Sequence, residues 1–459
     1  MALRLPKLLL YILSSISALS FGSFALISLK EKELRSARIS GALALLISTV
    51  FLAVTFASQI LQWWLIGFCA LILVLFIIAF LMPIGEFPKM LEIPKSRFDE
   101  RRVIFARARL QPGSERYHTY YKNHPEDFDV DEKWRGNPGL LSPETLFVEP
   151  FAFASAEASF SIPETLRETV DGHISSTVQT VNPQAASKYI KALGKYYGAL
   201  DVGICKLQAY HIYSHIGRGT GTYGEPIELS HQFGIAITVE MDYEMIGANP
   251  KAPGLMESAH QYAEAARVAV QLAAAIRALG YPARAHIDGN YRVIAPLLAR
   301  DAGLGEMSRM GLLITPRKGP RVRISIVTTD LPLIADEPTI DNSVIDFCTI
   351  CKKCAEACPS QAIAYDDRHK VDGALRWRIN PNQCYRYWTI AGTDCGRCMT
   401  VCPYAHADNL IHNLIRWGVK HSGFFRRVAL VMDNLFYGKI PAQRPEPAWT
   451  KLIQDSDKH

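Results

Sequence analysis

Residues 1–83 alternate long apolar stretches with short polar breaks, whereas the rest of the chain mixes apolar and polar positions at helix or strand spacing. The three stretches run over about Leu8–Leu29, Ile39–Ala57 and Ile60–Met82. Each is close to the roughly twenty residues that a helix needs to cross the hydrocarbon core of a bilayer. Trp63 and Trp64 begin the third stretch, where interfacial aromatic side chains are expected. The pattern predicts three transmembrane helices, because a signal peptide followed by buried helices would explain only the first stretch.

Two segments beside these stretches are rich in basic residues: Lys30, Lys32, Arg35 and Arg38 after the first, and Lys89, Lys95, Arg97, Arg101 and Arg102 after the third. The N-terminus carries only Arg4 and Lys7. With three spans, both basic segments lie on one side of the membrane, and the positive-inside rule assigns that side to the cytoplasm. We therefore expect a multi-pass protein of the inner, cytoplasmic membrane, in contact with membrane lipid, whose large domain faces the cytoplasm.

The rest of the chain predicts a linking segment followed by a mixed fold, α+β or α/β. Residues 84–150 are rich in proline, glycine and charge, which predicts an irregular strap. From about 151 to 340, predicted helices alternate with predicted strands. The clearest helices are Gln184–Tyr197 and Met256–Leu279, and the clearest strands are Gly234–Met241 and Arg321–Thr328.

The composition narrows the classes of function. Charged residues make up 20% and hydrophobic residues 49% of the 459 positions, which excludes a disordered or fibrous chain. The formal net charge is +6, and no dense run of Lys and Arg is interleaved with aromatic residues. We therefore expect no nucleic-acid partner.

Eight of the ten cysteines lie between residues 348 and 402, while Cys69 and Cys205 stand alone and are expected in apolar surroundings. The first group has the pattern C-x2-C-x2-C-x3-C-P and the second C-x10-C-x2-C-x3-C-P. The tight spacing favours metal over disulfides, and the two Cys-Pro steps favour [4Fe–4S] clusters over zinc. In two-cluster ferredoxins the fourth cysteine of a run ligates the other cluster. One predicted ligand set is Cys348, Cys351, Cys354 and Cys402, and the other is Cys358, Cys384, Cys395 and Cys398.

These cysteines predict a ferredoxin-like module over about 341–410, followed by a tail, 411–459, that packs on the core. Cys384 is the least typical ligand, because ten residues separate it from the next cysteine. A two-cluster module carries electrons and does no chemistry on a substrate. The electron acceptor is therefore expected in the domain formed by residues 151–340.

A glycine-rich segment, Ala302–Leu333, precedes the cysteines with the sequence AGLGEMSRMGLLITPRKGPRVRISIVTTDLPL. Taken alone, its glycines indicate ordinary loops at least as readily as a cofactor loop. Together with the cysteine module, the segment closely resembles the cobalamin-dependent reductive dehalogenases and their relatives, the epoxyqueuosine reductases. A second stretch, Asp99–Pro125, resembles the dehalogenase strap and not the tRNA enzyme. The resemblance covers about residues 97–440.

The resemblance implies a nitroreductase-like core that holds a base-off corrinoid beside two [4Fe–4S] clusters. It assigns the corrinoid contacts to Gly303, Gly305, Ser308, Gly311, Leu312, Gly319 and Pro320. It makes Tyr262 the proton donor and Arg321 the cation that lowers the pKa of that tyrosine, with Lys318 as the rival to Arg321. It also implies that Asn290 lines the substrate pocket.

Two features depart from the respiratory members of that family. The three spans are fused to the enzyme, and no twin-arginine pair precedes them, so we do not expect export. The tail Asn409–His459 resembles no flavin or ferredoxin reductase domain. We therefore expect an external electron donor, namely a ferredoxin, a flavodoxin reductase or the quinol pool.

The leading hypothesis is a membrane-anchored, corrinoid-dependent reductive dehalogenase that replaces a halogen on an organohalide by hydrogen. One alternative is a membrane iron–sulfur electron-transfer protein without dehalogenation, and the other is an epoxyqueuosine-type reductase acting on tRNA. The apolar stretches, and Tyr262 in place of an aspartate, oppose the tRNA enzyme. The sequence does not indicate which organohalide is used, and it leaves a homodimer open.

Overall fold

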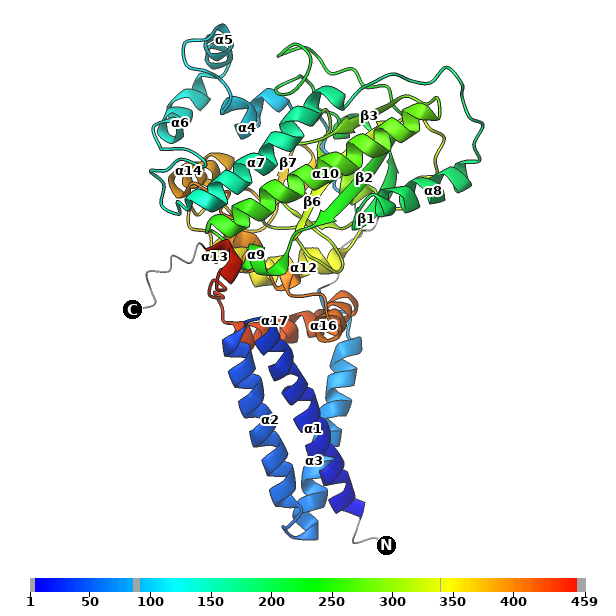
Figure 1. Ribbon diagram of the computed structural model, residues 1–459. Helices are drawn as coiled ribbons and strands as arrows, with labels where there is room; N and C mark the ends of the chain where they lie inside the picture. Colours follow the sequence, from blue (N-terminus) through cyan, green and yellow to red (C-terminus); the bar gives the residue numbers. More distant parts are fainter. Residues whose placement is uncertain (1–4, 86–90, 339, 452–459) are drawn as a thin grey trace. The chain divides into compact units, whose positions relative to one another are not determined.

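The computed structural model describes residues 5–85, 91–338 and 340–451 (Figure 1). Arg4 and Lys89, which entered the expected membrane orientation, lie outside the described residues. The chain forms two compact units. The first, here called the helical unit, joins Met1–Phe87 to Ala407–Pro445, and the second, the core unit, joins Pro88–His406 to Glu446–His459.

Three long helices match the three predicted stretches: α1 (Leu5–Lys30), α2 (Leu34–Val54) and α3 (Gln59–Leu81). By length and composition, all three are long and apolar enough to cross a membrane. Serines join α1 to α2, because the Ser14 hydroxyl donates to the Ser48 carbonyl at 3.0 Å and the Ser28 and Ser36 hydroxyls lie 2.9 Å apart. Small polar side chains of this kind let helices approach closely inside a bilayer.

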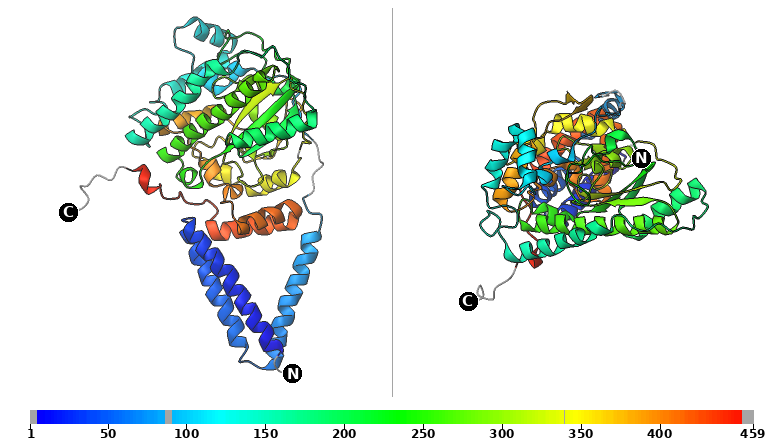
Figure 2. Two further views of the ribbon diagram at one scale, coloured as in Figure 1. Left: turned by 45° about the vertical axis from the view of Figure 1, so that its right-hand side comes forward. Right: turned by 90° about the horizontal axis from the view of Figure 1, so that it is seen from above.

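Two C-terminal helices, α16 (Leu410–His421) and α17 (Gly423–Tyr437), complete the helical unit and lie across one end of the long helices (Figure 2). The Phe24 ring lies 5.1 Å from Phe436, and Phe80 stacks on Trp417 at 6.0 Å. The sequence predicts instead that the tail 411–459 packs on the core, and among its described residues only 446–451 belong to the core unit. The physical reason for the difference is that α1–α3 offer an apolar, aromatic partner for these helices.

A four-stranded antiparallel sheet of order β1-β2-β6-β3 forms the centre of the core unit. Its strands are β1 (Asp201–Lys206), β2 (Phe233–Glu240), β3 (Ala283–His286) and β6 (Val322–Thr329). The long helix α10 (Ala252–Ala278) and α8 (Pro183–Tyr196) pack on one face. Helix α11 (Ala295–Asp301) covers the other face, where Cys205 is buried in the core as expected. The result is a mixed α/β fold in which strands alternate their side chains between two apolar cores.

The predicted irregular strap, 84–150, contains three short α-helices that the sequence pattern did not predict. It contains α4 (Ile104–Arg107), α5 (Glu115–Asn123) and α6 (Pro125–Arg135), and α7 (Pro150–Leu166) begins at its end. Tyrosine–carboxylate pairs join α5 to α6, with the Tyr120 hydroxyl donating to Asp127 and the Tyr121 hydroxyl to Asp131, each at 2.7 Å. Polar pairs replace the usual apolar stripe, which is why the sequence pattern does not show these helices.

The remaining elements are short. The helices are α9 (Tyr243–Gly247), α12 (Asn342–Cys351), α13 (Lys353–Glu356), α14 (Pro381–Ala391) and α15 (Arg397–Thr400). The strand pairs are β4 (Glu306–Met307) with β5 (Leu313–Ile314), and β7 (His369–Val371) with β8 (Ala374–Arg376). The 3₁₀ turns are Glu100–Arg102, Arg167–Thr169, Ala209–His211, Pro403–Ala405 and Ala448–Thr450.

Candidate active site and iron–sulfur module

The eight clustered cysteines are carried by α12 to α15 and the turns between them. Residues in the left-handed conformation separate the short helices, for example Lys352 with φ 57° between α12 and α13. Such a turn costs free energy for a lysine, so its presence indicates that the surrounding structure imposes it. It lets Cys351 and Cys354 lie on two different helices only a few residues apart.

The thiols of both predicted sets lie close enough to influence one another electrostatically. Burial raises the pKa of Cys402 well above its ordinary value, and the neighbouring thiols of Cys348, Cys351 and Cys354 raise it further. Burial likewise raises the pKa of Cys398. The other thiols of the second set, and the thiol of Cys354, raise this pKa further. Buried thiolates held this close repel one another, and iron supplies the compensating positive charge. The donor set therefore fits two adjacent iron–sulfur clusters, and the identity of each ligand stays a prediction.

Arg309 places a fully buried cation beside the first cysteine set. Its Nε donates to the Cys348 carbonyl at 3.0 Å, and its side chain also donates to the Ala364 and Asp366 carbonyls at 2.8 and 2.7 Å. The guanidinium lies 5.2 Å from the centre of the Trp377 ring. A positive charge at this position favours the more negative, reduced state of a cluster bound by Cys348.

Tyr262 and Arg323 form the most distinctive contact of the core unit. Tyr262 lies on α10 and is half-buried, and the Arg323 guanidinium from β6 lies 4.6 Å from its ring centre. The same guanidinium donates to the Ser258 hydroxyl at 2.7 Å and pairs with the Asp394 carboxylate at 3.1 Å. Because Asp394 precedes Cys395, Arg323 connects the tyrosine helix, the sheet and the cysteine module.

The electrostatics of this contact correct one expectation. Arg323 lowers the pKa of Tyr262, but burial and the carboxylates of Asp288 and Asp394 outweigh it, so the pKa lies above its ordinary value. The sequence predicts the opposite direction, a tyrosine pKa lowered by Arg321. A raised pKa keeps the Tyr262 hydroxyl protonated at neutral pH, which suits a proton donor.

The contacts described for Arg321 and Lys318 are with groups other than Tyr262, and their predicted roles stay predictions. Arg321 is buried and donates to the carbonyls of Ala405 and Met241 at 3.0 and 2.7 Å. Lys318 forms an ion pair with Glu240 at 2.7 Å. Neither of these contacts involves Tyr262, and the cation beside that ring is Arg323. Arg321 instead fastens the end of β2 to the cysteine module.

Asn290 is fully buried, and both the nitrogen and the oxygen of its side-chain amide form hydrogen bonds within the protein. Its amide donates to the Arg167 carbonyl at 2.9 Å and to the Thr220 hydroxyl at 3.1 Å, and its oxygen accepts from Arg284 at 2.9 Å. A Cβ at Gly219 would meet the Asn290 side chain. Asn290 therefore supports the glycine-rich loop 217–221, whereas contact with a substrate stays a prediction.

The predicted corrinoid contacts are Gly303, Gly305, Ser308, Gly311, Leu312, Gly319 and Pro320, and all lie in the segment 303–320. This segment packs against the cysteine module. A Cβ at Gly311 would meet Ile379, a Cβ at Gly319 would meet Tyr404, and Leu312 packs with Met399. The glycines thus have a packing role, and their contact with a corrinoid stays a prediction.

Sequence reasoning missed Arg323, Ser258 and Asp394. Arg323 did carry a signal, because a charged residue between Val322 and Ile324 interrupts an otherwise apolar strand. A buried charge in that position requires partners, and such requirements are common at functional sites. Ser258 and Asp394 carried no comparable signal, since polar residues in a helix and a loop are ordinary.

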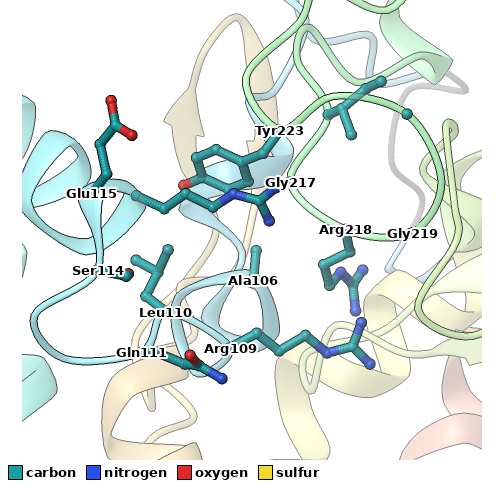
Figure 3. Close-up of a pocket in the computed structure, with 13 residues that line it drawn as sticks. Ala106, Arg109, Leu110, Gln111, Ser114, Glu115, Gly217, Arg218, Gly219 and Tyr223 are labelled. Carbon is teal, nitrogen blue, oxygen red and sulfur yellow. The ribbon is translucent and has the colours of Figure 1, made fainter.

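A pocket of about 590 Å³ opens between the strap and the glycine-rich loop 217–221 (Figure 3). Ala106, Leu110 and Ile216 give it an apolar wall, and three arginines, Arg109, Arg116 and Arg218, also line it. This volume lies within the range of small-molecule binding sites. Arg218 also lowers the pKa of Tyr262, so the inner wall of the pocket is within electrostatic reach of the Tyr262–Arg323 contact.

Comparison with known proteins agrees with this arrangement. A family model described as a 4Fe-4S dicluster domain matches residues 347–406. A tetrachloroethene reductive dehalogenase of Sulfurospirillum multivorans is 32% identical over 294 residues, which cover 56% of this chain and 58% of the relative. One from Desulfitobacterium hafniense is 37% identical over 193 residues, covering 40% and 34%. An epoxyqueuosine reductase of Leadbetterella byssophila is 30% identical over only 24% of this chain.

Solved structures give the same result for the fold. A catabolic reductive dehalogenase in complex with 3-bromo-4-hydroxybenzoic acid matches with a TM-score of 0.63 and 25% identity, covering 77% of this chain and 48% of that one. A reductive dehalogenase structure described in terms of B12-dependent dehalogenation matches with a TM-score of 0.62 and 25% identity, covering 76% and 47%. The chain therefore spans about half the length of these proteins.

The fold and the cysteines define a two-cluster iron–sulfur protein with a mixed α/β core. Within that class, the chain is similar in sequence and fold to the reductive dehalogenases, and over a shorter stretch it is similar in sequence to an epoxyqueuosine reductase.

Proposed function

We propose that this chain is a corrinoid-dependent reductive dehalogenase, held in the membrane by α1–α3. The observation that carries the proposal is the contact of Tyr262 with Arg323, which is itself paired with Asp394 beside the cysteine module. The overall reaction is R–X + 2e⁻ + H⁺ → R–H + X⁻. It needs a source of single electrons and a protonated group at the reacting carbon, and the core unit offers candidates for both.

The core unit has features that fit the two kinds of cofactor. The buried thiols suit two [4Fe–4S] clusters, and the buried Arg323 Nε has no hydrogen-bond partner among the described residues, which suits a polar group bound beside it. A nitroreductase-like core would hold the corrinoid in its base-off form, with the segment 303–320 in contact with it. When bound, the clusters would supply electrons and the corrinoid the cobalt at which the carbon–halogen bond is cleaved.

The residues of this chain have separate tasks in the proposed reaction. Tyr262 holds a proton on its hydroxyl and delivers it to the carbon that loses the halogen. Arg323 holds the ring in place and offsets the negative charge that remains on the Tyr262 oxygen. Ser258 and Asp394 fix Arg323 in turn, since each binds its guanidinium. Ser258 and Asp394 are buried and Tyr262 and Arg323 are half-buried, which limits the access of water that would compete for the proton.

We further propose that the protein lies in the inner membrane with the core unit in the cytoplasm. The three long apolar helices support this placement, and so do the basic residues that follow α1 and α3. A reducing compartment also keeps the cysteine ligands of iron–sulfur clusters from forming disulfides. The electron donor would be a ferredoxin, a flavodoxin reductase or the quinol pool, and a homodimer is compatible with all of these.

The first experiment is cofactor and halide analysis of the full chain, purified in detergent and reconstituted with iron, sulfide and hydroxocobalamin. We expect about eight irons and one cobalt per chain, and halide release from aryl or alkyl halides when titanium(III) citrate supplies electrons. Full iron and cobalt content without halide release from any halide tested would overturn the proposal. Full iron content without retained cobalt would instead favour a membrane electron-transfer protein.

The epoxyqueuosine reductase is the other candidate, because a relative of that activity matches a quarter of the chain. Epoxyqueuosine-containing tRNA incubated with the same preparation distinguishes the two. Conversion to queuosine without halide release would favour the tRNA enzyme.

A further inference from the structure

The pocket of Figure 3 contains an arginine, Arg109, whose charge is offset only at a distance, by the carboxylates of Asp288 and Glu164. Arg218 forms a buried ion pair with Glu100 at 3.0 Å, and Arg167 behind the pocket lies 3.4 Å from Glu164 and 3.8 Å from Asp288. Within the described residues, the Arg109 guanidinium has neither a hydrogen bond nor an ion pair, although it lines the pocket.

Figure 3 shows the guanidinium groups of Arg109 and Arg218 close together at one end of the pocket. Two cations brought together repel each other, and burial together with Arg167 and Arg218 lowers the pKa of Arg109. An arrangement of this kind costs free energy in the free protein, and an anion bound between the two groups removes that cost.

The rest of the pocket indicates what kind of anion fits. Ala106, Leu110 and Ile216 form an apolar wall that suits a hydrocarbon ring. Tyr223 also lines the pocket, and its buried hydroxyl lacks a hydrogen-bond partner among the described residues. This hydroxyl is available to hydrogen bond with a polar substituent of the ligand. A small amphipathic anion satisfies all three features, whereas a neutral haloalkane leaves Arg109 and Tyr223 unused.

The floor of the pocket is held rigidly. Glu100 accepts hydrogen bonds from the backbone N–H groups of Gly217 and Arg218 at 2.8 and 3.2 Å, and Asn290 binds Thr220. The loop that presents Arg218 is therefore fixed before any ligand arrives, which reduces the entropy lost on binding.

We propose that Arg109, assisted by Arg218, binds the anionic group of the organohalide in this pocket, so that the substrate is a halogenated carboxylate or phenolate. The inference rests on the proposed dehalogenase function and names its substrate class. It differs from what the tetrachloroethene dehalogenases act on, because tetrachloroethene carries no charge. Recognition of the charge also orients the ring, since Arg218 lies within electrostatic reach of Tyr262.

The test measures binding separately from turnover. The full chain in detergent, with both clusters reconstituted and with or without hydroxocobalamin, is titrated calorimetrically with 3-bromobenzoate and with its neutral analogue 3-bromobenzamide. We expect 3-bromobenzoate to bind more tightly, and Arg109→Gln to weaken its binding roughly tenfold to a hundredfold. Arg109→Lys should recover part of the loss. Arg102→Gln, which removes a cation from the same strap outside the pocket, should change neither affinity.

The other outcomes each have a definite meaning. Equal affinity for the acid and the amide, or an unaltered Arg109→Gln variant, would overturn the proposal. Loss of cobalamin retention in Arg109→Gln, with 3-bromobenzoate binding unchanged, would also overturn it and assign the pocket to the corrinoid phosphate. Arg109-dependent binding of 3-bromobenzoate without bromide release under titanium(III) citrate would support the anion site and count against dehalogenation of this substrate class.

Discussion

Arg323 shows how one residue links several parts of the core unit. Its guanidinium lies over the Tyr262 ring, donates to Ser258 and pairs with Asp394. A buried charge is tolerated only when groups of this kind surround it. The proposed proton donor and the cysteine module are therefore held in a fixed relation by a single side chain.

The Tyr262→Phe variant tests the proton donor directly. Removal of the hydroxyl should lower halide release by roughly a hundredfold or more, because general acid catalysis contributes about 10²–10⁴ in rate. Iron and cobalt content should be unchanged, since the ring and its contact with Arg323 remain. Tyr281→Phe is a matched control, because its hydroxyl donates to the Gln179 carbonyl at the surface. Unchanged turnover in Tyr262→Phe would assign the proton to another group.

The pH dependence of turnover distinguishes Arg323 from Arg321. Tyr262 donates only while protonated, so activity should fall as the pH rises through its pKa. Arg323 lowers that pKa, and Arg323→Gln should therefore move the alkaline limb of the pH–rate profile to higher pH. Turnover should also fall at least tenfold. Arg321→Gln should leave the alkaline limb in place but lower the thermal stability, because it removes the bonds to Ala405 and Met241. The reverse pattern would restore the original assignment to Arg321.

The sequence alone could not choose between these two arginines. Strand alternation directs residues 321, 323 and 325 to one face, and the Ser325 hydroxyl indeed donates to the Ala265 carbonyl of α10. Which arginine reaches Tyr262 depends on how far β6 is shifted along β2 and where α10 crosses the sheet. Those are long-range packing properties, and neither is encoded in the local pattern.

At the scale of elements, the cysteine module alternates helices of one to three turns with left-handed residues. We predict that the two cysteine runs cross, so that the last cysteine of each run ligates the cluster of the other. The thiols of Cys348, Cys351 and Cys354 raise the pKa of Cys402, although Cys402 lies at the end of the second run.

Paired substitutions test that crossing. Cys348→Ser and Cys402→Ser should each damage the same cluster, so the double variant should lose no more iron than either single variant. Cys348→Ser combined with Cys358→Ser should damage both clusters and lose about twice as much. Iron analysis and electron paramagnetic resonance of the reduced protein give the measurement. Additive loss in Cys348→Ser/Cys402→Ser would refute the crossed assignment.

How well each helix or strand could be predicted from the sequence depended on the interactions that stabilise it. The long apolar runs predicted α1–α3 well, and β2, β6, α8 and α10 followed from apolar periodicity. Helices α5 and α6 were missed because Tyr120–Asp127 and Tyr121–Asp131 pairs stabilise them instead of an apolar stripe. Polar pairs across two helices leave no periodic signal in either one.

On the scale of the whole molecule, the helical unit is built from both ends of the chain. Besides the Phe24–Phe436 and Phe80–Trp417 contacts, Phe76 lies 5.8 Å from Phe424. Local patterns indicated three spans but not the partner of the tail, because an amphipathic helix does not specify which apolar surface will cover it.

Deletion variants test the division into units. Removal of residues 1–87 alone should leave the aromatic side chains of α16 and α17 uncovered, so the protein should sediment without detergent. Removal of residues 407–459 as well should give a soluble core unit that retains about eight irons. Its main loss is the Lys251–Glu446 ion pair at 2.7 Å, and a surface pair of this kind contributes about 0–1 kcal/mol. Ultracentrifugation and iron analysis give the measurement, and a soluble product of the first deletion would contradict the two-unit division.

The split helical unit also sets an order of events during synthesis. Helices α1–α3 leave the ribosome first, and their partners α16 and α17 follow only after residues 88–406 of the core unit have been translated. At about 5–20 residues per second, that interval lasts roughly tens of seconds. If α1–α3 anchor the protein as proposed, the nascent chain would be tethered to the bilayer for that time while the cysteines and the pocket emerge. Any cluster that assembles during this interval would therefore be inserted before residues 407–445 complete the helical unit.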